Sequence, residues 1–268
     1  DASAEAIGHL QAAGWSEDDI VSLSQLIAFL SFQLRVIHGL KVLGGDESTA
    51  PETTRIEGAS DPGWQLHEHT LNPETHAPQG FVAHSLGWKP WVPPQPKEEL
   101  TQEQIDALIR PERIDSEYFR LLARDAAALK ARTLTDLDIF YNTDGGLGRA
   151  ERELAATVVS RFNGCEFCAS VHQQRSKDEG GDAAAIDRLL FEGLDADLGS
   201  DAWGVIRDAA RELTRSPFSF NSGCVAKLRS VGFDDLAIID LINSASFFNW
   251  ANRLMLTLGA PDVPKRYR

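Results

Sequence analysis

The feature that most constrains the fold is a succession of helical patterns over residues 101–268. Apolar residues recur there at helical spacing, and almost no segment alternates with a period of two residues. Proline is scarce in this stretch, and glycines separate one pattern from the next. The pattern predicts an all-α fold, with helices over 116–132, 148–162, 165–180, 182–193, 201–215, 224–232 and 234–259.

Two zones of different character precede this helical stretch. Residues 14–45 begin with a capping signal at Ser16 and Asp18 and end at a pair of glycines, which predicts one long helix. The middle of this helix is apolar nearly all round, so we expect it to be buried. Residues 51–100 hold eight of the twelve prolines and three of the six tryptophans, which predicts an extended, non-helical connector.

The chain also contains an internal repeat, because residues 14–45 parallel residues 232–260. The alignment needs a three-residue insertion after Trp15 and a shift of 215 positions. We therefore expect residues 1–50 to be the tail of a first, cysteine-free copy, 51–103 the connector and 104–268 the domain that carries the chemistry. The matching pairs are Asp19 and Asp234, Leu26 and Leu241, Ile27 and Ile242, Ser31 and Ser246, Phe32 and Phe247, Leu43 and Leu258, and Gly44 and Gly259.

The composition is that of a soluble globular protein and excludes several classes of partner. A formal net charge of −14 argues against nucleic-acid phosphates and anionic membrane surfaces. No stretch is expected to reach the length of a membrane span, and the start of the chain lacks the basic and apolar regions of a secretory signal. Three cysteines do not make a disulfide scaffold in 268 residues, so we expect a cytoplasmic location.

Two of those cysteines fall within one helical turn, in the stretch NGCEFCASVH at residues 163–172. The Asn-Gly break places Cys165 at the start of a helix, where free backbone N–H groups and the helix dipole favour a thiolate. Cys168 follows at i+3, which brings the two Cα atoms to about 5 Å, within disulfide range. His172 lies four residues after Cys168 on the same face, where an imidazole can exchange a proton with a thiol.

The preceding helix can supply a carboxylate to this histidine, since it ends at the same Asn-Gly turn and should fold back alongside. Glu151 lies in its first turn and is expected to be solvated. Glu153 is further in and better placed to project toward the cysteines. A carboxylate beside His172 would fix its tautomer and raise its basicity, which gives a proton relay feeding a thiolate.

The residues alone leave other interpretations of the cysteine pair open. Cys165 and Cys168 could be packing residues or a structural dithiol in a helical binding or assembly module. A zinc site formed by the two cysteines, His172 and Glu153 is chemically reasonable. Structural zinc sites usually draw a second ligand pair from a distant segment, and none is visible, so no metal and no cofactor are expected. Cys224 is interpreted as a small hydrophobic residue.

The segment ERELAATVVSRFNGCEFCASVH resembles the signature of AhpD-like alkylhydroperoxidases, within the carboxymuconolactone decarboxylase superfamily. The intervals between Glu153, Cys165, Cys168 and His172 all match that signature. The segment 232–259, with Asn252-Arg253, is similar to the closing helix of the family. The resemblance covers about 104–268 and implies an all-helical bundle that reduces hydroperoxides with thiols.

Carried over by position, the resemblance implies that Cys168 is the peroxidatic cysteine and that Cys165 closes the disulfide. Glu153 and His172 would form the relay. Phe167 occupies the position between the cysteines where the best-studied branch has a second histidine, so one proton-transfer group is missing. The implied partners are a small hydroperoxide and a thiol reductant, with no nucleic acid and no membrane. We also expect a homo-oligomer, because one chain leaves much apolar surface uncovered.

Overall fold

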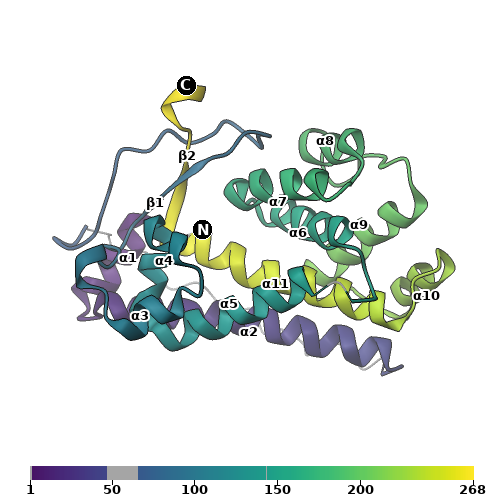
Figure 1. The fold of residues 1–268 in the computed structure, drawn as a ribbon, viewed down its shortest axis with the longest axis horizontal. Helices are drawn as coiled ribbons and strands as arrows, with labels where there is room; N and C mark the ends of the chain where they lie inside the picture. Colours follow the sequence, from purple (N-terminus) through teal and green to yellow (C-terminus); the bar gives the residue numbers. More distant parts are fainter. Residues whose placement is uncertain (1, 47–65, 143) are drawn as a thin grey trace.

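The computed structural model describes residues 2–46, 66–142 and 144–268, and helices dominate these residues (Figure 1). The predicted all-α class is confirmed. The described part also has one small sheet of two strands and four short 3₁₀ turns, at 97–99, 111–115, 123–125 and 265–267. The helices are α1 (Ala4–Ala12), α2 (Glu17–Leu43), α3 (Gln102–Ala107), α4 (Glu117–Leu122), α5 (Ala126–Tyr141), α6 (Arg149–Asn163), α7 (Glu166–Asp178), α8 (Ala183–Phe191), α9 (Asp201–Thr214), α10 (Ser222–Ser230) and α11 (Asp235–Leu258).

Helix α11 is the central element of the core, and α2, α5, α6 and α9 all pack against it (Figure 1). It begins where the Asp234 side chain accepts a hydrogen bond from the N–H of Ala237. Apolar residues follow on every side, and most of them are buried. A helix that is apolar all round is stable only when other elements cover it, which explains its central position.

Helix α2 packs against α11 in the antiparallel direction (Figure 1), with Gln25 beside Trp250 near one end of the contact and Gly39 beside Ile242 near the other. Its start is a capping box, in which the side chains of Ser16 and Asp19 each bond the other's backbone N–H. The ring of Phe32 stacks on that of Trp250 with 5.7 Å between centroids. At Gly39 the helices come so close that an added Cβ would lie 2.7 Å from Cγ2 of Ile242. Glycine is therefore needed at this crossing.

The two segments of the predicted repeat thus form the α2–α11 pair. Leu43 and Leu258, which the alignment matches, are the last residues of the two helices. The matched residues Phe32 and Phe247 face each other, with their ring centroids 6.1 Å apart. This arrangement is what an approximate twofold axis between two copies would produce. The repeat and the three domain boundaries stay predictions, and residues 51–65 of the connector lie outside the described residues.

One face of α2 is exposed, so the expectation that this helix is buried all round is wrong. The face toward α11 is covered by that helix. Its buried residues recur at helical spacing and include Val21, Ala28 and Gly39. On the opposite face, no element of the described chain covers the apolar side chains, and each of them is between 41% and 58% exposed. These residues are Leu26, Ile27, Leu30, Leu34, Ile37 and Leu40.

The same helix corrects the expectation about membrane-spanning length. Among the described residues, α2 alone is long and apolar enough by length and composition to cross a membrane, with a mean hydropathy of 1.7. Core helices of soluble proteins pass the same test, and 33% of its most apolar window is buried. The one arginine within the apolar part of this helix, Arg35, is itself buried.

The helix expected over 116–132 is broken into α4, a 3₁₀ turn and α5. The break occurs because the Asp125 carboxylate accepts a hydrogen bond from the N–H of Ala128 at 3.0 Å and so starts a new helix. Helix α5 then continues to Tyr141, beyond the expected end. The bend places the two halves side by side, and the ring of Tyr118 lies 5.9 Å from the guanidinium of Arg132.

The described part of the connector, from residue 66 on, is largely extended and runs along one side of the helical bundle (Figure 1). Strand β1 (Gly87–Pro90) pairs antiparallel with β2 (Gly259–Asp262), which directly follows α11. Trp88 is buried, and its indole N–H donates to the carbonyl of Met255 at 3.1 Å. The side chain of Gln173 on α7 donates to the carbonyl of Ala83 at 2.9 Å. The connector is therefore fixed to the helices that form the site.

Candidate active site

The turn between α6 and α7 places the cysteines as the sequence predicts. Gly164 ends α6 with a φ of 76°, a left-handed conformation that glycine adopts readily. Cys165 follows as the residue just before α7, and its N–H donates to the carbonyl of Ser160 at 2.9 Å. Cys168 lies in the first turn of α7. The pair thus stands at the positive end of the helix dipole.

Both cysteines are free thiols and both are buried, Cys165 at 1% exposure and Cys168 at 5%. Burial raises the pKa of the Cys165 thiol well above its usual value. The hydrogen bond from Cys165 has the opposite effect on Cys168 and lowers its pKa, assisted by the Asn252 side chain and the charge of Arg132. The two thiols therefore differ in character, and Cys168 is the one that ionises first.

Glu153 and His172 meet as the sequence predicts. Glu153 is completely buried, and its Oε2 lies 2.5 Å from Nδ1 of His172. Its other oxygen, Oε1, accepts hydrogen bonds from Nη2 of Arg149 at 2.5 Å and from Nε at 2.8 Å. Burial opposes ionisation of this carboxyl, but the contacts with His172 and Arg149 outweigh it and lower its pKa. A carboxylate on Nδ1 leaves Nε2 of the imidazole to exchange protons.

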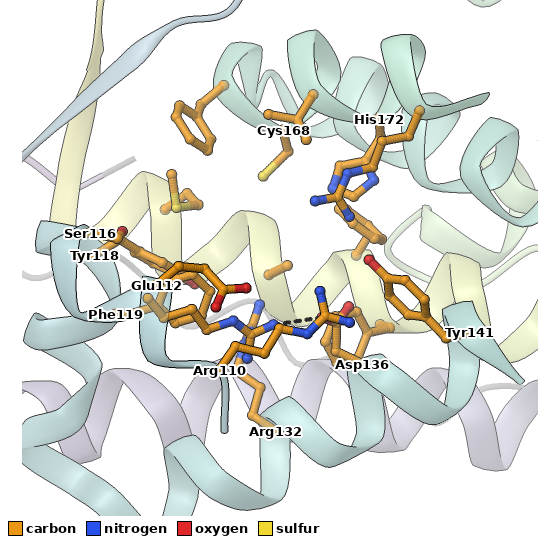
Figure 2. A pocket seen from close by; sticks show the side chains of 18 residues that line it. Arg110, Glu112, Ser116, Tyr118, Phe119, Arg132, Asp136, Tyr141, Cys168 and His172 are labelled. Atoms are coloured by element: carbon orange, nitrogen blue, oxygen red, sulfur yellow. Dashed lines mark ion pairs between the residues drawn. The ribbon is translucent and has the colours of Figure 1, made fainter. Parts of the chain in front are cut away.

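A cavity of about 370 Å³ lies in front of the dithiol (Figure 2). Cys168 and His172 reach it from α7, whereas Cys165 and Glu153 lie behind them and do not line it. Phe167, the residue between the cysteines, also lines the wall. The remaining wall comes mainly from α5, α11 and residues 110–119. The charged side chains around the cavity, including Arg175 of α7, are Arg110, Glu112, Arg113, Arg132, Asp136 and Arg175.

All four predicted residues thus belong to one constellation, although their catalytic roles stay predictions. Glu153 contacts His172, Cys165 contacts Cys168, and His172 and Cys168 share the cavity. A shared metal centre is not formed. Among the residues that the structure describes, no three His, Cys, Asp or Glu side chains gather where they could hold a metal ion.

The sequence interpretation missed three side chains of the site. Arg149 pairs with Glu153 at i+4, a spacing that could have revealed it. Asn252 was noted only as part of the segment that resembles the family's closing helix. Its amide donates a hydrogen bond to Ser160 Oγ at 3.1 Å and also forms hydrogen bonds with the two cysteines. Nothing in the sequence marks Arg132 as a site residue, because it is a single charged residue within the helical pattern of α5. The structure shows that it lies on the buried face of this helix.

Comparison with known proteins supports the resemblance that the motif suggests. The profile of the carboxymuconolactone decarboxylase family matches residues 126–212, which contain Arg132, Glu153, both cysteines of the pair and His172. This match supports the likeness to the AhpD-like proteins of that superfamily. The resemblance expected from the motif is therefore confirmed. No curated protein sequence matches this chain significantly.

Among solved structures, the chain is similar to an uncharacterized peroxidase-related protein from Silicibacter sp. TM1040. The two share 27% sequence identity with a TM-score of 0.53, and the match covers 67% of this chain and 96% of the other.

Proposed function

We propose that this chain reduces organic hydroperoxides with the Cys165–Cys168 dithiol. The observation that carries the proposal is the placement of the pair at the start of α7. Cys168 lines the cavity together with His172, whereas Cys165 lies behind it, and a hydrogen bond from Cys165 lowers the pKa of Cys168. A peroxide-reducing dithiol needs this division into an attacking thiolate and a protonated partner.

The first step oxidises Cys168. His172 takes the proton of the Cys168 thiol, and the thiolate attacks the terminal oxygen of the hydroperoxide. A sulfur–oxygen bond forms and the oxygen–oxygen bond breaks, which leaves a sulfenic acid on Cys168 and an alkoxide. His172 returns the proton to the alkoxide and an alcohol departs. Glu153 stabilises the imidazolium that exists between these two transfers.

The second step closes the disulfide. The Cys165 thiol attacks the sulfur of the Cys168 sulfenic acid, a sulfur–sulfur bond forms, and the hydroxyl and the thiol proton leave as water. A dithiol from outside the chain then reduces the disulfide by thiol exchange. The peroxidase-related description of the structural neighbour favours this chemistry over decarboxylation.

Peroxide consumption in the presence of a dithiol reductant tests the proposal. Cys168→Ser is expected to lower kcat/KM by about a hundredfold or more, because the attacking atom is lost. Without the reductant, Cys165→Ser should undergo one oxidation event per chain, seen as a sulfenic acid that dimedone traps. Cys224→Ser on α10 is the matched control and should behave as wild type, since Cys224 lies outside the cavity. Unchanged turnover in Cys168→Ser would falsify the proposal.

The burial of both thiols favours a second candidate, a structural dithiol in a non-enzymatic module. That role predicts that neither thiol reacts with iodoacetamide in the native protein. The proposed peroxidase instead requires fast alkylation of Cys168 through the cavity and slow alkylation of Cys165. Mass spectrometry of the fragments that carry each cysteine separates the two candidates.

A further inference from the structure

The cavity wall opposite Cys168 contains a buried cation that the proposed mechanism does not use as a reactant. Arg132 extends from α5 into the cavity and is only 6% exposed (Figure 2). Within the described residues its guanidinium has no carboxylate partner, and its Nε has no hydrogen-bond partner. Buried charges in proteins are normally paired, so an arginine of this kind requires an explanation.

Aromatic rings hold the Arg132 guanidinium in place without neutralising it. Its carbon Cζ lies 5.1 Å from the ring centroid of Phe247, 5.9 Å from that of Tyr118 and 6.0 Å from that of Trp250. The neighbouring Arg113 differs, since it has Asp136 at 3.9 Å. Arg132 thus keeps its positive charge directed at the contents of the cavity.

Tyr118 adds a second donor at the same place. Its hydroxyl is buried and has no hydrogen-bond partner in the described residues. Burial raises the pKa of Tyr118 to about 12, so the hydroxyl keeps its proton and can donate it to an anion. The wall as a whole carries four arginines against two carboxylates, in a chain whose net charge is −14. The positive charge at this cavity is therefore local and specific.

We propose that Arg132 and Tyr118 bind a carboxylate, so that the cavity selects small organic hydroperoxides that carry a carboxylate at one end and place the peroxide at Cys168. The planar fork of a guanidinium matches a carboxylate in two parallel hydrogen bonds. Apolar side chains such as Phe248 and Met255 line the space between and suit an organic body. A cavity of about 370 Å³ limits that body to a small one. The substrate class rests on the proposed peroxidase function, whereas the carboxylate site does not.

Alkylation of Cys168 tests the carboxylate site without any peroxide. Iodoacetate and iodoacetamide carry the same reactive carbon, and only iodoacetate has a carboxylate. A change in the reactivity of the thiolate alters both rates equally, so the ratio of the two rates reports the anion site alone. The ratio at Cys168 of the reduced chain is expected to exceed that of free cysteine by about tenfold, with saturation in iodoacetate.

Arg132→Gln should return this ratio to the value of free cysteine, and Arg132→Lys should retain part of the preference. Lys130→Gln is the matched control, because it removes a positive charge from an exposed position of the same helix, and its ratio should stay at the wild-type value. A wild-type ratio equal to that of free cysteine overturns the site, even if Arg132→Gln does not fold. Failure of both reagents to reach Cys168 also overturns it, since the proposed substrates are larger.

Turnover of a short hydroperoxy acid and of its methyl ester tests the substrate class. The acid is expected to have a kcat/KM about tenfold above that of the ester in wild type, and equal values in Arg132→Gln. Equal values in wild type overturn the selection while leaving the peroxidase function intact. If neither compound is consumed but the iodoacetate preference persists, the peroxidase function fails and the carboxylate site stands.

Discussion

Asn252 shows how a single side chain changes the acidity of a buried thiol. It receives a hydrogen bond from the Asn163 amide at 3.1 Å and is held by Ser160, so its orientation is fixed from two sides. In this position it lowers the pKa of Cys168. Asn252→Leu should therefore raise the pKa of Cys168 and shift the pH midpoint of its alkylation by iodoacetamide upward.

The half-buried Cys224 provides an internal reference in the same samples, because its environment on α10 does not include Asn252. Its alkylation profile should stay in place in Asn252→Leu. An unchanged midpoint at Cys168 would show that the amide does not stabilise the thiolate.

The ionisation of Glu153 makes the free energy of unfolding depend on pH. Its pKa is lowered in the folded chain, so in acid the unfolded chain binds more protons than the folded one. The stability that Glu153 contributes is therefore fully present above the usual pKa of a glutamate, about 4.3, and is lost as the pH falls through the lower folded value. Urea unfolding at a series of pH values should show this loss in wild type.

Glu153→Gln should remove that part of the acid dependence, because no group titrates at this position. It should also lower peroxide turnover by about ten- to a hundredfold, since the amide cannot stabilise the His172 imidazolium. An acid profile identical to that of wild type would contradict the assignment of the titration to Glu153.

Among the elements, the sequence determined α6 and α7 well because their signals are local. The Asn163-Gly164 break and the helical spacing fix both ends of the turn, and with it the positions of Cys165 and Cys168. The break at Asp125 was missed, since an aspartate inside a helical pattern is compatible with an exposed position as well as with a cap. The position of Arg132 in the cavity could not be predicted from the sequence, because its aromatic neighbour Phe247 lies on α11, far along the chain.

The crossing of α2 and α11 is an element-scale feature that a single methyl group should disturb. Gly39→Ala places a Cβ 2.7 Å from Cγ2 of Ile242, within the packed core. The clash should outweigh the higher helix propensity of alanine and destabilise the fold by about 1–3 kcal/mol in urea unfolding.

Gly204→Ala is the matched control in α9, where an added Cβ meets no atom within 4 Å. That change should stabilise the fold by up to about 1 kcal/mol. Adding Ile242→Val to Gly39→Ala should recover part of the loss by removing an atom from the contact. If Gly39→Ala also stabilises the fold, the two helices are further apart than in this structure.

At the scale of the whole molecule, the two faces of α2 differ in burial. One face packs on α11 and completes the core beneath the cavity, whereas the other exposes a continuous row of leucine and isoleucine side chains. A single soluble chain rarely exposes so long an apolar row. We expect this row to pack against the same row of a second copy, which is the simplest self-complementary arrangement for a long helix.

Replacing two central residues of the row tests this expectation. Leu30 and Leu34 are 43% and 52% exposed, so Leu30→Glu with Leu34→Glu should not disturb the core. Light scattering after gel filtration should give the mass of a dimer or larger assembly for wild type and of one chain for the double variant. Leu236→Glu on α11 is the control, because Leu236 is 59% exposed but lies outside the row. A wild-type protein that is monomeric at micromolar concentration, or that binds neutral lipid vesicles through α2, would contradict self-association.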